Sequence, residues 1–314
     1  MQVQLVSVPY RYDEHKQGVG GGPEALIAAG LIEDIAAAGL LPADAGAAFL
    51  DPDDREPGRT AVNIGKLGAS TAALVCASRL AGAGCLVLAG DDTAAIGVIS
   101  GLQAAHGPGA RIGVVWIDAH GDFNTPETSY SGILAGMSLA IVAGLAGPNW
   151  RDAAQMAAPI PTDRIVVAGA RQLDAKEEAL LRVTDVHLYS SDDLRAGSGF
   201  SNAIVRLTGT VDVLLLHVDV DVLDPRLIPS SSTPSPDGLS VEEAQQALGV
   251  VLGSGKVAAF TICGINPGGG ARGDRSIESS KTLIAGAIKS WQETPAAPVS
   301  GDQTLHSADE PRGH

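Results

Sequence analysis

Residues 111–122 read RIGVVWIDAHGD, an apolar run typical of a buried strand that ends in three polar side chains at alternate positions, Asp118, His120 and Asp122. Side chains two residues apart on an extended strand share a face, so all three can point at one centre. Taken alone, the pattern also fits a strand that ends in an ordinary polar loop. The other strand ends of the chain therefore decide between these two interpretations.

Short apolar runs alternate with helix-like segments along most of the chain. Runs typical of buried strands lie at 3–9, 85–90, 111–118, 163–170, 186–190, 213–219 and 256–264. Helix-like segments between them include 22–38, 93–106, 133–146, 174–183, 240–253 and 275–291. This alternation predicts an α/β fold with a mostly parallel sheet covered on both faces. We expect one domain over 1–292, with a surface excursion at 41–62 and a disordered tail at 293–314.

The composition excludes several classes of function. The chain carries 21 basic and 36 acidic side chains, a net charge of −15, which repels nucleic-acid phosphates and anionic lipid. The N-terminus has no features of a signal peptide, and no apolar stretch reaches the ~18 residues of a spanning helix. The three cysteines, Cys76, Cys85 and Cys263, lack metal-like spacing, and we expect buried thiols at Cys85 and Cys263, which lie in apolar runs. We therefore expect a cytoplasmic protein that binds a small molecule, and neither nucleic acid nor membrane.

Acidic side chains follow three of the predicted strands. The pairs are Asp91 with Asp92, Asp118 with Asp122, and Asp219 with Asp221. Because open α/β sheets bind ligands at the carboxyl ends of their strands, these acids should meet in one place. A buried cluster of carboxylates repels itself unless cations neutralise it. Oxygen ligands with one imidazole suit manganese better than zinc, so the sequence predicts two divalent ions, manganese by preference.

Five stretches resemble signature blocks of the ureohydrolase family of arginases, agmatinases and formimidoylglutamases. They are HKQGVGGGPEAL (15–26), AGDDT (89–93), DAHGDFNTP (118–126), DVDVLDP (219–225) and STPSPDGLS (232–240). The resemblance implies a three-layer αβα fold and a centre of two manganese ions. It also implies hydrolysis of a linear guanidine or amidine C–N bond by a hydroxide that both metals share. Family members are commonly trimers or hexamers, which implies a homo-oligomer here.

The resemblance also implies roles for individual residues. The metal-ligand positions are occupied by Asp92, Asp118, His120, Asp122, Asp219 and Asp221, of which His120 and Asp122 are also expected to be catalytic. The expected substrate-binding residues match positions that hold an α-carboxylate (Asn124, Thr125, Ser131), help to bind an α-amino group (Asp174) or line the metal pocket (Thr233).

Three positions depart from the family pattern. Asp92 stands where the family has its first ligand, a histidine. Ala135, in SGILAG (131–136), replaces a proton-shuttling histidine, and Gly264, in GINP (264–267), replaces the glutamate that grips the guanidinium. These changes remove a charge partner and a proton donor, and should open space near the metals. The added carboxylate should also make the bridging water less acidic.

Two hypotheses of different classes follow. The leading one is a metal-dependent hydrolase of a guanidino or amidino C–N bond in a modified guanidino amino acid, such as a hydroxylated arginine. Its basis is that the positions that bind the amino-acid end of the substrate are retained. The positions that contact its guanidino group, 135 and 264, are not. The alternative is a catalytically weak or inactive homologue that binds a ligand or partner as a regulator. Ordinary arginase activity ranks third, because two of its contacts are absent.

Overall fold

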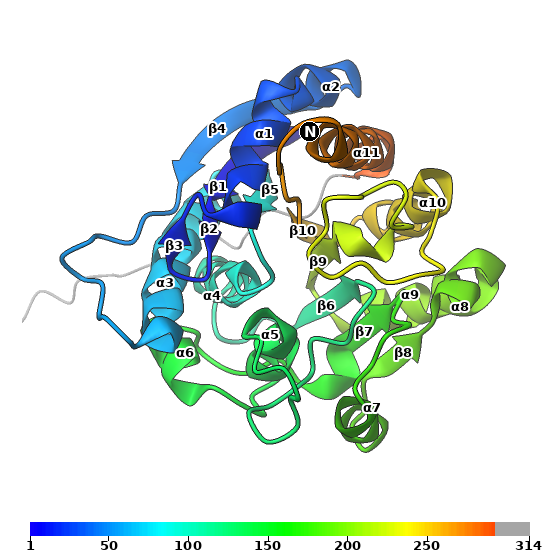
Figure 1. The fold of residues 1–314 in the computed structure, drawn as a ribbon. Helices are drawn as coiled ribbons and strands as arrows, with labels where there is room; N and C mark the ends of the chain where they lie inside the picture. Colours follow the sequence, from blue (N-terminus) through cyan, green and yellow to red (C-terminus); the bar gives the residue numbers. More distant parts are fainter. Residues whose placement is uncertain (293–314) are drawn as a thin grey trace, which may run out of the picture.

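The computed structural model describes residues 1–292, and its central feature is a sheet of eight parallel strands (Figure 1). The strand order is β4-β1-β5-β10-β9-β6-β7-β8. The bounds are β1 (Gln2–Val8), β4 (Leu41–Ala47), β5 (Gly84–Ala89), β6 (Ile112–Ile117), β7 (Ile165–Ala168), β8 (His187–Tyr189), β9 (Val213–Asp219) and β10 (Val257–Cys263). A two-stranded hairpin, β2 (Tyr10–Arg11) and β3 (Glu14–His15), follows β1. The predicted α/β class is confirmed; the tail at 293–314 lies outside the described residues, and the single-domain assignment stays a prediction.

Helices cover both faces of the sheet because its strands are apolar on both sides. In β5, Leu86 and Leu88 pack into one core, whereas Cys85 and Val87 pack into the other. One core includes side chains from α3 (Thr60–Leu80), α4 (Ala94–His106), α5 (Ser138–Val142), α6 (Pro148–Ala153) and α7 (Ala175–Arg182). The other includes side chains from α1 (Gly22–Ala28), α2 (Leu31–Ala37), α8 (Ser191–Ala196), α9 (Ser198–Thr210), α10 (Val241–Leu252) and α11 (Ala271–Ala287). The result is the expected three-layer αβα arrangement.

Helix α3 packs closely against α4 through glycines. A Cβ atom on Gly97 would lie 2.5 Å from the carbonyl oxygen of Gly68, and one on Gly101 would lie 2.7 Å from that of Ala72. With 21 residues, α3 is also the one described helix long and apolar enough to cross a membrane by length and composition, although Asn63, Lys66 and Arg79 interrupt its apolar sequence. Its contacts with α4 and the sheet make it a core helix of this fold.

The structure differs from the sequence prediction in three segments. The expected excursion at 41–62 begins with β4, an edge strand in which no side chain is fully buried, so its sequence lacks an apolar pattern. The predicted helix at 22–38 is two helices, separated at Gly30, whose φ of 91° breaks the helical path. The predicted helix at 133–146 contracts to α5, preceded by a loop that reaches the functional site.

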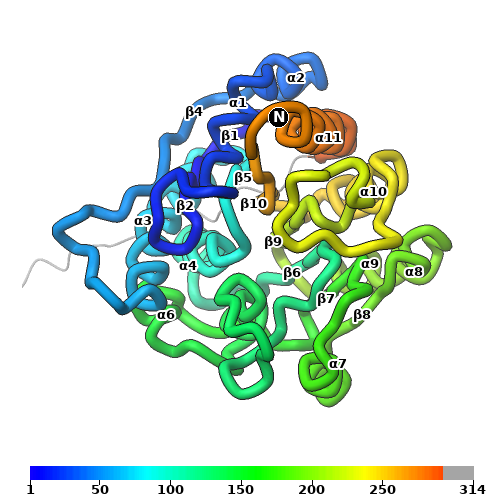
Figure 2. Tube along the Cα trace, viewed as in Figure 1, coloured from blue at the N-terminus to red at the C-terminus, as the bar shows by residue number. Residues whose placement is uncertain are grey.

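The centre of the sheet joins distant parts of the chain. The tube in Figure 2 shows β10 and β9, from the last third of the sequence, between β5 and β6. The acidic stretches that follow β5, β6 and β9 therefore leave the same edge of the sheet, the edge at which open α/β folds bind ligands.

Candidate metal centre

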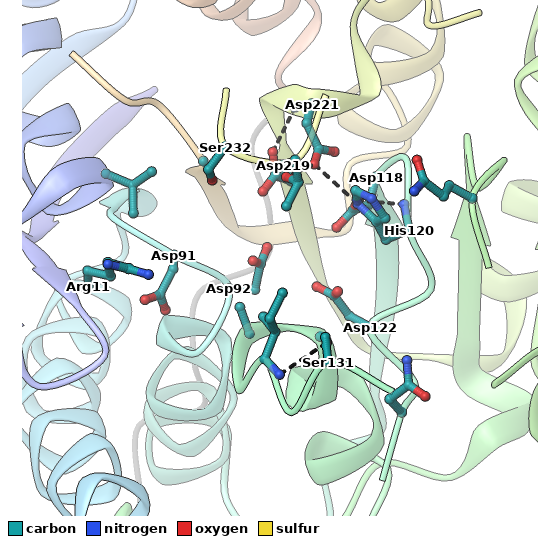
Figure 3. Close-up of a pocket in the computed structure, with 18 of the residues that line it drawn as sticks. Arg11, Asp91, Asp92, Asp118, His120, Asp122, Ser131, Asp219, Asp221 and Ser232 are labelled. Carbon is teal, nitrogen blue, oxygen red and sulfur yellow. Dashed lines mark hydrogen bonds and ion pairs between the residues drawn. The ribbon is translucent and has the colours of Figure 1, made fainter. Parts of the chain in front are cut away.

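A cavity of about 690 Å³ lies at the carboxyl ends of β5, β6 and β9. Its lining includes every residue predicted as a metal ligand: Asp92, Asp118, His120, Asp122, Asp219 and Asp221. Figure 3 shows these side chains approaching one common space from different elements. Because the sheet is parallel, three acidic segments that follow different strands, the last about one hundred residues after the second, meet here.

The ligand atoms form two overlapping groups. Asp92, Asp118 and Asp122 offer carboxylate oxygens within 4.8 Å of one another, and Asp118, His120 and Asp221 form a second group of the same size. Asp118 belongs to both groups. Two sets of ligands that share one carboxylate suit two neighbouring divalent ions.

His120 lies between two carboxylates. Its Nδ1 is 3.2 Å from Oδ1 of Asp118 and 3.2 Å from Oδ2 of Asp221. Burial lowers the pKa of His120, but the hydrogen bonds to the two carboxylates outweigh this and raise it to about 11. The position of the imidazole between Asp118 and Asp221 therefore favours positive charge, as expected for a place suited to a cation.

Asp122 and Asp219 are buried among like charges. Burial, and then the neighbouring carboxylates, raise the pKa of each well above its ordinary value. Oδ2 of Asp122 is buried and has no hydrogen-bond partner among the described residues. An unpartnered carboxylate oxygen that faces other carboxylates fits a divalent cation as its missing partner. The donor set of five carboxylates and one imidazole fits manganese.

Gly264 lies directly against Asp219. Its φ is +78°, and a Cβ atom there would lie 2.2 Å from Oδ1 of Asp219. The Asp219 carboxylate therefore occupies the space next to Gly264. The sequence-based expectation that the missing side chain opens space at this position is wrong. Ala135, the other departure, also lines the cavity.

The adjacent acids Asp91 and Asp92 have different partners. Asp91 accepts hydrogen bonds from the backbone N–H groups of Tyr12 (2.7 Å) and Thr93 (3.0 Å), which ties the N-terminal hairpin to the start of α4. Burial raises the pKa of Asp91 to about 6. Asp92 turns toward the ligand cluster, with Oδ1 3.0 Å from Nε2 of His217 and 3.1 Å from Sγ of Cys263. Asp92, rather than Asp91, is also the acid whose carboxylate groups with those of Asp118 and Asp122.

His217, near the end of β9, is a direct neighbour of the site, with Nε2 3.0 Å from Oδ1 of Asp92. Its ring is fully buried and stacks on Trp116, with 3.6 Å between the ring centroids. The signal in the sequence is the spacing of His217 and Asp219, which places both side chains on one face of β9. Cys263 is paired in register with Asp219, so only the strand order brings it to the same place.

Four of the five predicted substrate-binding residues line the cavity: Asn124, Ser131, Asp174 and Thr233. Nδ2 of Asn124 donates to Oδ2 of Asp174 at 3.3 Å, and the Thr233 hydroxyl donates to Oδ2 of Asp221 at 2.8 Å. Thr125 is absent from the lining. Its backbone N–H donates to Oγ1 of Thr128 at 2.7 Å, within its own turn.

Glu177 is a lining residue that the sequence analysis missed. It accepts hydrogen bonds from the backbone N–H groups of Phe123 (2.8 Å) and Asp174 (3.2 Å). The first contact holds the segment of Asp122, and the second is half of the capping box that begins α7. Burial raises the pKa of Glu177 to about 6. The clue in the sequence was the capping pattern Asp174-x-x-Glu177.

Two tyrosines and an arginine complete the mouth of the cavity. Arg11 and Tyr12 come from the hairpin after β1, and Tyr130 comes from the loop after β6. Figure 3 shows Arg11 beside Asp91. No motif marked these residues, because their position depends on how the hairpin folds over the sheet.

Comparison with known proteins identifies the family. The sequence model described as "Arginase family" matches residues 1–288. Arginase from Bacillus caldovelox is 30% identical over 278 residues, covering 84% of this chain and 91% of its own length. Arginase-1 from Rattus norvegicus is 30% identical over 294 residues, covering 90% of each chain. The structure of Entamoeba histolytica arginase in complex with L-ornithine matches with a TM-score of 0.81 at 25% identity, covering 91% of this chain and 98% of the other. The chain therefore belongs to the arginase family of ureohydrolases, which hydrolyse carbon–nitrogen bonds in linear amidines.

Proposed function

We propose that this chain hydrolyses the guanidino C–N bond of a modified amino acid, such as a hydroxylated arginine, in preference to arginine. One observation carries the proposal. The candidate amino-acid-binding residues and the metal-ligand cluster line one cavity, whereas Ala135 and Gly264 contribute no charged side chain to it.

The centre would hold two divalent ions, manganese by preference. One would be held by Asp92, Asp118 and Asp122, and the other by Asp118, His120 and Asp221, with Asp219 lining the same cavity. When bound, such ions make water nucleophilic near neutral pH and polarise the group under attack. The unpartnered Oδ2 of Asp122, together with the overlap of the two ligand groups, supports this assignment.

The amino-acid end of the substrate would lie against Asn124, Ser131 and Asp174. Asp174 can accept a hydrogen bond from an α-amino group, and Asn124 and Ser131 can donate to an α-carboxylate. The related arginase from Entamoeba histolytica holds L-ornithine, which has both groups. A role for Thr125 stays a prediction that requires its turn to open.

The guanidino group of the substrate would lie in a part of the cavity with one carboxylate fewer than in arginases, at position 264. A guanidinium gains roughly 1.5–3 kcal/mol from a charge-assisted hydrogen bond to a carboxylate, and Gly264 cannot provide one. A hydroxyguanidine is less basic, because its oxygen withdraws electron density, and it therefore depends less on that contact. Its hydroxyl group can also donate a hydrogen bond to an acid of the cluster.

Asp122 is the best-placed group to move the proton of the reaction. With Oδ2 on a metal ion, the other carboxylate oxygen of Asp122 could take a proton from the attacking water and return it to the departing amine. This would compensate for the missing shuttle at Ala135. His120 would fix the position of the neighbouring carboxylates and stays a predicted catalytic residue.

The test is a substrate comparison with manganese-loaded protein. We expect kcat/KM for Nω-hydroxyarginine to exceed that for arginine by at least about tenfold, with ornithine and hydroxyurea as products. Agmatine, guanidino acids and formimidoylglutamate serve as competitors of related chemistry. Faster turnover of arginine would contradict the proposal, and no turnover of any of these compounds would favour the non-catalytic alternative. A cytoplasmic location and a trimeric or hexameric assembly stay predictions.

A further inference from the structure

We propose that Asp92, His217 and Cys263 form a second coordination set that binds one zinc-class divalent ion. We call this set the sulfur site. It shares Asp92 with the manganese centre but draws its other two ligands from residues outside that centre. The proposal concerns which ion the protein binds, so it stands independently of the substrate.

The three ligand atoms lie within the reach of one ion. Oδ1 of Asp92 is 3.0 Å from Nε2 of His217 and 3.1 Å from Sγ of Cys263, and the sulfur and nitrogen are 3.4 Å apart. Bond lengths of about 2.3 Å to sulfur and about 2.0–2.2 Å to nitrogen or oxygen place the ligand atoms of tetrahedral zinc about 3.3–3.6 Å apart. Outward shifts of a few tenths of an ångström would therefore admit the ion.

The sheet holds these side chains in place. Asp92 follows β5, His217 lies near the end of β9, and Cys263 is the last residue of β10. His217 and Cys263 are fully buried and Asp92 is 6% exposed. Stacking on Trp116 fixes the imidazole ring. Because both strands are central, the ligands are positioned before an ion arrives, which lowers the entropic cost of binding.

The donor chemistry separates this site from the main centre. The main centre offers oxygen atoms and one imidazole, a set that suits manganese, whereas a thiolate with an imidazole and a carboxylate suits zinc. Binding of the ion would displace the thiol proton of Cys263 to solvent. The same oxygen of Asp92 faces His217 and Cys263, so zinc would compete with manganese for this residue.

The opposing interpretation is a purely hydrogen-bonded cluster. In that case the Cys263 thiol and Nε2 of His217 both form hydrogen bonds with Oδ1 of Asp92, and no ion binds. The two interpretations predict different spectra, because only a coordinated thiolate transfers charge to a bound metal.

Cobalt(II) is the probe for the first experiment. The wild-type protein loaded with Co²⁺ should show a near-ultraviolet thiolate-to-metal charge-transfer band. Cys263→Ser should lose this band, and Cys85→Ser, which alters another buried cysteine of the same core, should keep it. The zinc affinity of Cys263→Ser should be lower than that of the wild type by at least about tenfold. Even the loss of a residue that only contacts a metal ligand has an effect of that size. Cobalt that binds without the band, or a band that persists in Cys263→Ser, would refute the sulfur site.

A second measurement needs no variant. X-ray absorption of the wild-type protein with one equivalent of Zn²⁺ should show a single sulfur at about 2.3 Å from the metal. A shell of nitrogen and oxygen alone would refute the proposal even if Cys263→Ser fails to fold. Added Zn²⁺ should also release one manganese ion from the manganese-loaded protein. None of these measurements uses turnover, so their failure is distinct from failure of the proposed reaction.

Discussion

A Cβ atom on residue 264 would lie 2.2 Å from Oδ1 and 2.5 Å from Oδ2 of Asp219. The φ of +78° at Gly264 is also one that side chains of L-residues rarely adopt. The position at which this chain departs from the guanidinium-binding glutamate of arginases is therefore in contact with a candidate metal ligand. We therefore expect head-group recognition and metal binding to be coupled at this contact.

Gly264→Ala should lower metal content instead of simply narrowing the pocket. The new methyl group would displace the Asp219 carboxylate, so we expect loss of at least one manganese ion per chain and a fall in kcat. Elemental analysis after dialysis measures the stoichiometry. Gly269→Ala is the matched control, since a Cβ at Gly269 meets nothing within 4 Å. Unchanged metal content in Gly264→Ala would contradict the coupling. For the same reason, Gly264→Glu should not create an arginase.

Asp122→Asn should remove both a ligand and a proton carrier. We expect fewer than two manganese ions per chain and a loss of kcat of at least about 10²-fold, the range of general acid–base catalysis. Asp224→Asn is the control, because Asp224 pairs with the exposed Arg226. Equal activity of Asp122→Asn and the wild type would refute a catalytic role for Asp122.

Removal of metal should destabilise the protein at neutral pH. Manganese binds only the folded cluster, so at one hundred times its Kd it should add about 2.7 kcal/mol per site to the free energy of unfolding. Urea unfolding with manganese, compared with unfolding after chelation, measures the difference. Identical midpoints would mean that the carboxylate cluster holds no ion.

The metal-free protein should lose stability as the pH rises from about 4 to above 6. Burial raises the pKa of Glu177 from 4.5 to about 6, so the folded state holds this proton more tightly than the unfolded chain. Its contribution is fully present below pH 4.5 and is lost as the pH rises through about 6, on the order of 1–2 kcal/mol. Glu177→Gln should flatten this part of the stability profile. The exposed neighbour Glu178→Gln is the control, and equal slopes in both variants would contradict the assignment.

Asp92→His should move the pH–rate profile. Replacing a carboxylate by a neutral imidazole makes the centre more positive, which favours ionisation of water at lower pH. In the wild type we expect an alkaline optimum, and in Asp92→His we expect the rising limb of kcat to shift to lower pH. If Asp92→Ala leaves both the metal content and the profile unchanged, Asp92 is no ligand and the electrostatic argument fails.

The sequence determined the fold class and the composition of the main cluster. Apolar runs that alternate with helix-like segments require a sheet covered on both faces, and Asp118 and Asp122 follow such a run directly. Their alternate spacing is a local property of an extended chain, so it could be read without knowing the neighbouring strands. Each ureohydrolase-like motif also lies within one short segment, so the resemblance could be recognised from the sequence alone. The family match confirms this resemblance.

Only the tertiary structure decided what surrounds that cluster. Strand order and register bring His217 and Cys263 to Asp92, although Cys263 is 171 positions away in the sequence. The same packing sets the Asp219 carboxylate against Gly264, and it leaves β4 at an edge without an apolar pattern. These features depend on contacts between segments that are remote in sequence, and periodicity within a single segment contains no information about them.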